Sequence, residues 1–536
     1  MNTSMRPSFI QKELIMQSIN IRNGITKLGS TGCLGLTVVA LVGCLQGETT
    51  STTGPGPVTP SGSAALQGQL AFVNNRDSKT LSVVGIDGQG SLRMISTMGT
   101  ANEFAGYVLG DMQVSSGEWV FMNLTAGNKV ATIDPLSGAT PIHEANLPVG
   151  TRPVHMYRDP TDGEIIWSMN DGDATNGDDS ERCGGVGASV TVLHNSHVGA
   201  GGNPPFVVGT TCTRASGHGV AAFSRPTATD VNIPRYAVVT NEKGGQMAFL
   251  DNNQASGTYL KMVARLDLCD DVGQASLVPV GPACDNENAT ALDDPLTANG
   301  SKPHGIRWSQ HTGKIYSYQE AYREIVEVDP KSIVSGPGHN QAAITRRLSL
   351  AGTPYTSYGI TPNGRFLFLR GRDTGTDPLH IIGKLAVVDL SAPGVLTITD
   401  LPNLVDVVPS AFKFTPDGQR MYLLASDTAT GNEDQRTAQK KNRLFVFNPS
   451  TFPAAPQPVA EIDLSPAAAH NFDVLVQGSG QASAVLVSNG GAGSYGSVSL
   501  INANNQIADS LLVGVNPGAV MFYYPGMAAA GNQTSS

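Results

Sequence analysis

Four histidines occupy similar sequence contexts, and an imidazole can bind a metal ion or carry a proton. They are His155 in Arg-Pro-Val-His, His218 in Ser-Gly-His-Gly, His304 in Lys-Pro-His-Gly and His470 in Ala-Ala-His-Asn. Each stands at the start of a short apolar run that we expect to be the first strand of a repeated unit. Imidazole is a ligand of copper, zinc, iron and nickel. These four residues are therefore candidate metal ligands.

The alternative is that these histidines cap turns or bind water. Three of them, His155, His218 and His304, belong to consecutive units and form the better ligand set. His470 is expected in a supporting position or on the opposite wall. Metal binding needs neutral imidazoles, so the affinity of such a site should fall as the pH drops through about 6.5.

A polar insertion carries two further candidates. Residues 171–181 alternate oxygen-bearing side chains in the manner of a calcium loop. The sixth and twelfth positions, Asn176 and Arg182, depart from the EF-hand pattern, so a solvated acidic insertion is favoured over calcium. The pair His194-x-x-His197 can hold a metal ion or simply be solvated, and the polar loop favours solvation.

Cysteines are few, and four of them follow the N-terminal segment. An even number in an exported chain favours disulfides over free thiols. Three pairings are open, and we prefer the two local ones because each would close an insertion. These pairs are Cys183–Cys212 and Cys269–Cys284. The chain has no Cys-x-x-Cys-His, which argues against covalently attached haem.

Other chemistry leaves no recognisable motif in the sequence. There is no Gly-x-Ser-x-Gly elbow and no Walker loop, so no catalytic residue or substrate can be named. The formal net charge is −10, and the densest basic cluster spans only residues 436–443. A nucleic-acid partner would require a basic stripe, and its absence excludes that class.

The N-terminus has the features of an export signal. Arg22 and Lys27 precede an apolar run over residues 33–43, which is shorter than the about 20 residues of a membrane-spanning helix. The run ends in Leu-Val-Gly-Cys44, which is similar to the bacterial lipobox and implies that Cys44 is lipidated. Residues 1–43 would then be a lipoprotein signal peptide, with an ordinary cleaved signal peptide as the alternative. By the same resemblance, Gln46 in place of Asp favours the outer membrane.

The composition indicates a β-rich chain. Charged residues make up 15% of it, against about 25% in an average domain, while Gly and Pro number 61 and 33. Residues 44–67 are mostly Thr, Ser, Gly and Pro, which predicts a flexible tether. We expect the folded domain over residues 68–525 and a disordered tail over 526–536.

A four-stranded unit recurs through the folded domain. Its first hairpin turn carries Asn-Gly or Asp-Gly, as in Pro-Asn-Gly364 and Pro-Asp-Gly418, and neighbouring units lie 46, 51 and 54 residues apart. Such turns join antiparallel strands, and a four-stranded unit of this length is typical of a β-propeller blade. The sequence therefore predicts an all-β propeller.

The number of blades follows from the positions of these units. Seven units start near residues 104, 152, 217, 303, 356, 409 and 469, and a partial unit opens near residue 70. A last strand over residues 518–524 would lie innermost in the blade begun at residue 70 and close the ring. This arrangement predicts eight blades, or seven if one weak unit is an insertion.

The repeated units are similar to the YVTN-repeat propellers of exported bacterial proteins, a group that also resembles the propellers of cytochrome d1 and nitrous oxide reductase. The resemblance spans residues 68–525. Nitrous oxide reductase holds a copper cluster with histidines of its inner strands, so the resemblance adds copper, beside other transition metals, as a candidate for the four histidines here. This chain lacks the full histidine set and a second copper domain, so nitrous oxide reduction is not expected.

Two functions remain open at the level of sequence. The first is a lipid-anchored binding or scaffold protein in the cell envelope, facing the periplasm or the cell surface, whose partner is a protein, a surface polymer or a metal ion. The second is a metalloprotein with a redox or electron-transfer role that uses copper or non-covalent haem.

Overall fold

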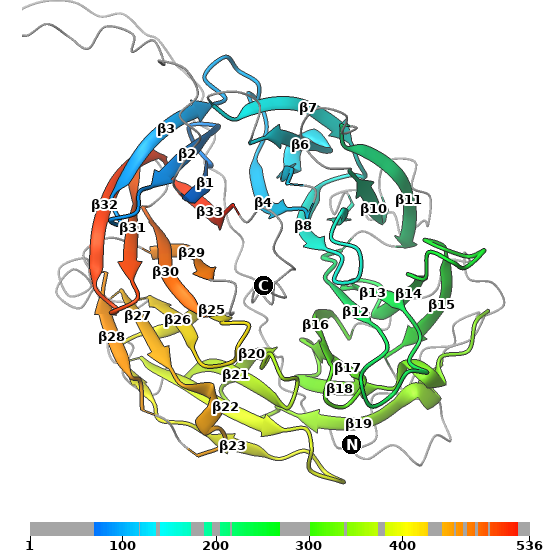
Figure 1. The fold of residues 1–536 in the computed structure, drawn as a ribbon. Coiled ribbons are helices and arrows are strands. Elements are labelled where there is room, and N and C mark those ends of the chain that lie inside the picture. Colours follow the sequence, from blue (N-terminus) through cyan, green and yellow to red (C-terminus); the bar gives the residue numbers. More distant parts are fainter. Residues whose placement is uncertain are drawn as a thin grey trace, which may run out of the picture. The chain divides into compact units, whose positions relative to one another are not determined.

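The computed structural model describes residues 69–523, apart from 117, 136–139, 173–186, 196–203, 215–216, 269–300, 337–339, 374–380, 427–441, 455–456, 465–468, 477–480 and 491–493. These residues belong to one compact unit, 60–536, and form eight antiparallel sheets arranged as a ring (Figure 1). The predicted eight-bladed propeller is confirmed, and the seven-bladed alternative is wrong. The predicted signal peptide, Cys44, tether and tail lie outside the described residues.

The first and last described strands meet in blade 1, where the sheet order is β3-β2-β1-β33. The innermost strand is the C-terminal one, as predicted, and the backbone N–H of Tyr523 continues the pairing by donating to the Leu70 carbonyl at 2.8 Å. The strands of this blade are β1 (Gln69–Asn75), β2 (Thr80–Ile86), β3 (Leu92–Met98) and β33 (Pro517–Phe522).

Blades 2 to 5 are each built from four consecutive strands, the first of them innermost (Figure 1). Blade 2 has β4 (Leu109–Val114), β5 (Val120–Leu124), the 3-10 helix η1 (Thr125–Gly127), β6 (Lys129–Asp134) and β7 (Ile142–Pro148). Blade 3 has β8 (Pro153–Arg158), β9 (Ile165–Asn170), β10 (Ala188–His194) and β11 (Phe206–Arg214). Blade 4 has β12 (Ala221–Ser224), β13 (Tyr236–Asn241), β14 (Gln246–Asp251) and β15 (Met262–Asp267). Blade 5 has β16 (Pro303–Ser309), β17 (Lys314–Gln319), β18 (Glu324–Val328), η2 (Pro330–Ser332), η3 (Gln341–Ala343) and β19 (Ile344–Ser349).

Blades 6 to 8 repeat this plan, and blade 6 gains a short fifth strand that pairs with β22. Blade 6 has β20 (Tyr355–Ile360), β21 (Phe366–Asp373), β22 (Ile382–Asp389), β23 (Ile398–Asp400) and β24 (Leu404–Val405). Blade 7 has β25 (Val408–Phe414), β26 (Met421–Ser426), β27 (Arg443–Phe447), η4 (Pro449–Thr451) and β28 (Ala460–Asp463). Blade 8 has β29 (Ala469–Val476), β30 (Ala482–Asn489), β31 (Tyr495–Asn502) and β32 (Ile507–Val515).

The hairpin turns form for the reason that the sequence suggested. Gly364 and Gly418 adopt φ values of +74° and +69°, which a residue without a Cβ reaches at little cost. Each donates its N–H to the threonine three residues earlier, at 2.8 Å to Thr361 and 2.9 Å to Thr415. These turns set the register of the first two strands in blades 6 and 7.

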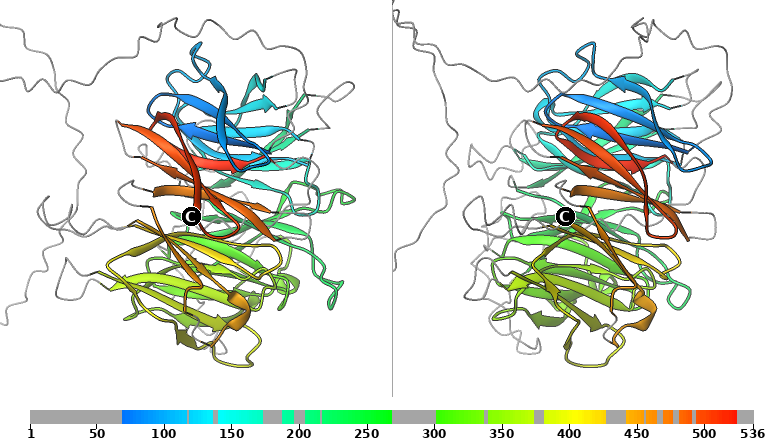
Figure 2. Two further views of the ribbon diagram at one scale, coloured as in Figure 1. Left: turned by 60° about the vertical axis from the view of Figure 1, so that its left-hand side comes forward. Right: turned by 90° about the vertical axis from the view of Figure 1, so that its left-hand side faces the viewer.

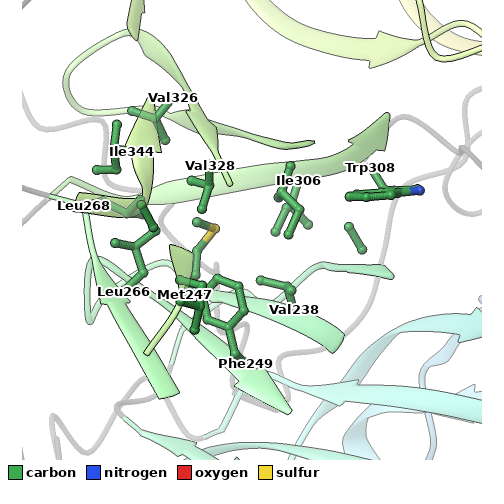
Figure 3. Packing of buried hydrophobic residues seen from close by; sticks show 14 of the residues in the cluster. Val238, Met247, Phe249, Leu266, Leu268, Ile306, Trp308, Val326, Val328 and Ile344 are labelled. Carbon is green, nitrogen blue, oxygen red and sulfur yellow. The ribbon is translucent and has the colours of Figure 1, made fainter. Parts of the chain in front are cut away.

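The hydrophobic core lies in the wedges between neighbouring blades. Figure 3 shows one such wedge, where Met247 and Phe249 of blade 4 pack against Ile306 and Trp308 of blade 5. Burial of each large apolar side chain contributes about 1.5–3 kcal/mol. The side views show sheets packed face to face around the ring (Figure 2). Because apolar packing in the wedges holds the blades together, side chains at the beginnings of the inner strands need not contribute to the core and can form a binding site.

Candidate functional site

The inner strands are irregular near their beginnings. In seven of the eight blades, the pairing of the inner strand with the adjacent strand shifts register near this end. Asp111, His304 and His470 lie within such shifts, and His155 is the first paired residue after one. The irregular steps are Leu109/Met112, Pro153/His155, Pro303/Ile306, Tyr355/Ser357, Pro409/Ala411, Ala469/Asn471 and, opposite β33, Val73/Asn75. A bulge re-aims the side chains around it and is common beside functional sites.

His155 and His218 meet although 63 positions separate them in the chain. His155 lies on β8, and His218 precedes β12 by three residues. Their Nε2 atoms face each other at 2.7 Å, and the ring centroids are 4.5 Å apart at 74°. The predicted convergence of histidines from neighbouring blades is therefore present for this pair.

Each ring of this pair is held from behind by a carboxylate. The Nδ1 of His155 donates to Oδ2 of Asp111 at 2.8 Å, and the Nδ1 of His218 donates to Oδ2 of Asp171 at 3.0 Å. The other oxygen of Asp171 accepts from the Gly219 N–H at 3.3 Å. A carboxylate only accepts, so both Nδ1 atoms carry the proton and both Nε2 lone pairs point at the partner ring.

Two facing lone pairs repel each other, so this contact requires a positive species between the rings. A proton held by one ring satisfies the contact, and a metal ion is the other species that can do so. Burial disfavours a charged His155, but the charge and the hydrogen bond of Asp111 outweigh this, and the pKa of His155 is raised above its ordinary value. The pair is thus poised to hold a cation.

His304 completes the trio by packing on His218, with centroids 4.9 Å apart and rings tilted by 47°. Burial lowers the pKa of His304, and the nearby His218 lowers it further, which favours the neutral form of this ring. Within the described ranges, no group of three or more His, Cys, Asp or Glu side chains is arranged to hold a metal ion. Two nitrogens therefore converge, while the third ring lies beside them.

The remaining candidates divide between described and undescribed residues. His470 lies on β29, but its side chain is outside the described residues, as are His197, Cys183, Cys269, Cys284 and most of the predicted calcium loop. The first residue of that loop, Asp171, serves His218. Cys212 lies on β11 and is disulfide-bonded, and its predicted pairing with Cys183 stays a prediction. His194 ends β10 beside Glu164, at 3.8 Å.

Sequence reasoning missed the two carboxylates. Asp111 lies near the start of a first strand, as the histidines do, so an alignment of the first strands would have identified it as a candidate site residue. Asp171 gave no such signal, because it follows the second strand of its blade and resembled part of an acidic loop.

No protein-family model matches the chain, and no curated protein matches it. Among solved structures, dihydro-haem d1 dehydrogenase NirN, in complex with DHE, is 12% identical with a TM-score of 0.50, covering 87% of this chain and 77% of that one. The periplasmic gluconolactonase of Pseudomonas aeruginosa is 13% identical with a TM-score of 0.46, covering 85% and 99%. A hypothetical selenium-binding protein of Sulfolobus tokodaii is 9% identical with a TM-score of 0.46, covering 88% and 95%.

These similarities concern the fold alone. They include a d1-type propeller, in agreement with the resemblance drawn from the repeats, whereas the YVTN and lipoprotein assignments stay predictions. No helix in the described part of the chain is long and apolar enough to cross a membrane.

Proposed function

We propose that this chain is an exported, lipid-anchored binding protein whose propeller holds a transition-metal ion between His155 and His218. One observation carries the proposal: two Nε2 atoms face each other, and a carboxylate accepts from the Nδ1 of each ring. Metal-binding histidines commonly donate their second nitrogen to such a carboxylate, which fixes the tautomer and raises the basicity of the ligand.

The spacing of the pair fits a metal after a small adjustment. Two nitrogen ligands at tetrahedral positions around an ion lie about 3.3 Å apart, so the rings would separate from their 2.7 Å contact. Both side chains are partly exposed, at 18% and 21%, and an ion can reach them. His304 lies beside His218, with ring centroids 4.9 Å apart, and is the residue that would supply a third ligand.

Two carboxylates of this chain fix the orientation of the two imidazoles before an ion binds. Asp111 and Asp171 hold both imidazoles in the tautomer that presents Nε2, so little rearrangement is needed when an ion arrives. A bound copper or zinc ion would supply Lewis acidity, and copper would also supply electron transfer. The geometry itself supports binding, and a redox role would need an electron partner.

A haem-type cofactor is the second candidate, favoured by an imidazole whose Nδ1 is bonded to a carboxylate, as in a haem-binding histidine. The spacing argues against both histidines binding one haem iron. Nitrogens on opposite faces of a haem lie about 4 Å apart, whereas these lie 2.7 Å apart. Only one of the two rings could serve as an axial ligand.

Metal analysis tests the proposal. The protein, purified with a tag that contains no histidine, is loaded with Cu²⁺ or Zn²⁺, desalted and analysed by mass spectrometry. We expect stoichiometric metal in the wild type and loss of most of it in His155→Ala and His218→Ala. His143→Ala is the matched control, because His143 lies on β7 and bonds to Asn146. Wild-type protein that retains no metal, or equal retention in all variants, would overturn the proposal.

A further inference from the structure

Exposed apolar side chains recur at one position of the blades. In blades 2, 3, 5, 6, 7 and 8, a large apolar residue, between 39% and 71% exposed, is the first residue of the outermost strand or lies in the connection that leads to it. These residues are Ile142, Phe206, Val334, Val395, Val459 and Ile507. Blade 4 supplies Val231, 73% exposed, from the connection between its first two strands. Seven of the eight blades therefore contribute to one set of residues, which we call the apolar rim.

Strand direction places the whole rim on one face of the ring. Neighbouring strands of a blade are antiparallel, as in blade 4, so the outermost strand begins at the end of the ring where the inner strand finishes. The connection between the first two strands lies at that same end. His155, His218 and His304 belong to the opposite face, because they lie where inner strands begin. Equivalent positions in the blades of a ring lie at similar heights along its axis, so the rim residues lie approximately in one plane.

The chain enters the propeller on the same face as the rim. β1 is the second strand of blade 1 and runs antiparallel to the innermost strand β33, so Gln69 lies where β33 ends (Figure 1). The predicted tether over residues 44–67 joins the propeller at this point. A flexible segment of that length has a root-mean-square span of about 25–30 Å, so a lipid on Cys44 would hold this face close to a bilayer.

Charged side chains on the rim face are paired with one another. Lys331 of blade 5 donates to Asp230 of blade 4 at 2.6 Å, and this pair joins the two blades whose rim valines are the most exposed. In blade 6, Arg365 donates to Asp389 at 2.7 Å on the same face. A paired charge is less costly to bring against an apolar phase than a single one.

The histidine face also exposes apolar side chains, but their positions in the blades differ. Val108 precedes an inner strand, Tyr495 begins a third strand, and Val405 lies on the added strand β24. A protein partner typically buries a contiguous apolar patch, whereas a lipid surface can contact single side chains spread around a ring. The regular placement of the rim residues therefore favours a lipid surface.

We propose that the apolar rim contacts a phospholipid membrane and holds the propeller with its histidine face turned away from the bilayer. The rim side chains would enter the boundary between headgroups and acyl chains, where apolar residues of interfacial proteins lie. The direction of approach rests on the proposed function, because the anchor at Cys44 brings the rim face to the membrane. The proposed metal site would then be open to the aqueous side.

Vesicle flotation tests the rim without the lipid anchor. The chain over residues 45–536 retains the tether and the whole compact unit 60–536, and it is mixed with vesicles of phosphatidylcholine, which has no net charge to repel a protein of net charge −10. We expect measurable binding, and a loss of about tenfold or more when four rim valines are replaced by serine. These substitutions are Val231→Ser, Val334→Ser, Val395→Ser and Val459→Ser.

The matched control carries serine at the exposed apolar residues of the histidine face and should bind as the parent chain does. Its substitutions are Val108→Ser, Val405→Ser and Tyr495→Ser. A parent chain that stays off the vesicles, a rim variant that binds equally well, or an equal loss in the control variant would overturn the proposal.

Two further measurements keep the outcomes distinct. All the substituted side chains are exposed, so thermal unfolding should be unchanged, and Val231→Ser and Val334→Ser alone provide second variants if the fourfold variant is unstable. Palmitate labelling of the wild type measures the anchor alone. Failure of the anchor is therefore distinguishable from failure of the rim.

Discussion

At the scale of single residues, Asp111 controls the proton of His155. Asp111→Asn keeps a hydrogen-bond acceptor and removes the negative charge, so burial would then dominate and the pKa of His155 should fall. NMR titration of the imidazole C–H resonances in metal-free protein measures this pKa. Asp417→Asn, at an exposed turn, is the control and should leave it unchanged. An unaltered pKa in Asp111→Asn would contradict the role given to this carboxylate.

The raised pKa of His155 also gives stability a pH dependence. The folded state holds this proton more tightly than the unfolded chain does, so the stabilisation is complete below the unfolded value of 6.5 and is lost as the pH rises through the folded pKa. His304, with its lowered pKa, acts in the opposite sense, because the unfolded chain binds its proton more tightly. Urea unfolding from pH 6 to pH 8 should therefore show a smaller fall in stability for Asp111→Asn than for wild type.

We propose that lipidation of Cys44 attaches the chain to a membrane. Cys44→Ser should abolish lipid labelling and release a soluble protein, because a thioether-linked diacylglycerol and an amide-linked chain together give stable anchoring. Labelling with palmitate and cell fractionation measure both effects. Wild type that takes up no palmitate, with a variant that stays in the membrane fraction, would refute the lipobox.

At the scale of elements, the hairpin turns offer a matched pair of glycines. Gly418→Ala places a Cβ in open space, so only the positive φ opposes it, at a cost of about 1 kcal/mol. Gly364→Ala has the same φ problem and also brings its Cβ to 2.8 Å from the backbone nitrogen of Gln310. Chemical unfolding should show a clearly larger loss of stability for Gly364→Ala. Equal losses of stability would mean that the turn of blade 6 can move away from Gln310 at little cost in free energy.

The closing strand β33 supplies apolar side chains to the wedges on both of its sides. Ala519 and Met521 pack toward blade 2, and Val520 and Phe522 pack toward blade 8. Deleting the chain from Gly518 onward should therefore expose an unpaired edge and two apolar faces, and lead to aggregation.

Size-exclusion chromatography and thermal melting measure this effect. Truncation after Tyr523 is the control, because it leaves β33 intact and should keep the protein monomeric. A monomeric protein with unchanged melting after deletion from Gly518 would show that β33 is dispensable for closure.

The elements were far easier to predict than the site. Blade starts were predicted well because each blade repeats a local pattern, a glycine turn between two apolar strands, that needs no knowledge of the other blades. The meeting of His155 with His218 followed from the repeat. The carboxylates that accept from these histidines could not be predicted in this way. Asp111 belongs to a different blade, blade 2, and Asp171 follows the second strand of blade 3, outside the first-strand pattern.

At the scale of the whole molecule, the ring separates stability from binding. The wedges between blades are apolar, whereas polar groups of three successive blades, Asp111, His155 and His218, meet at the inner strands around the axis. A substitution at the axis should therefore change ligand affinity with little effect on melting, and a substitution in a wedge should do the reverse.

Because β1 and β33 pair in one sheet and close the ring, the chain could begin and end in another blade without changing the arrangement of the sheets. The Tyr523 N–H reaches the Leu70 carbonyl at 2.8 Å, and the Gln69 amide donates to the Tyr523 carbonyl, so the two ends of the folded chain lie side by side. A short linker could join them, and new ends could be opened at the exposed turn near Pro393 and Gly394. Such a circular permutant would keep every sheet contact except those at the new break, and blade 6 would then be the one that holds both chain ends.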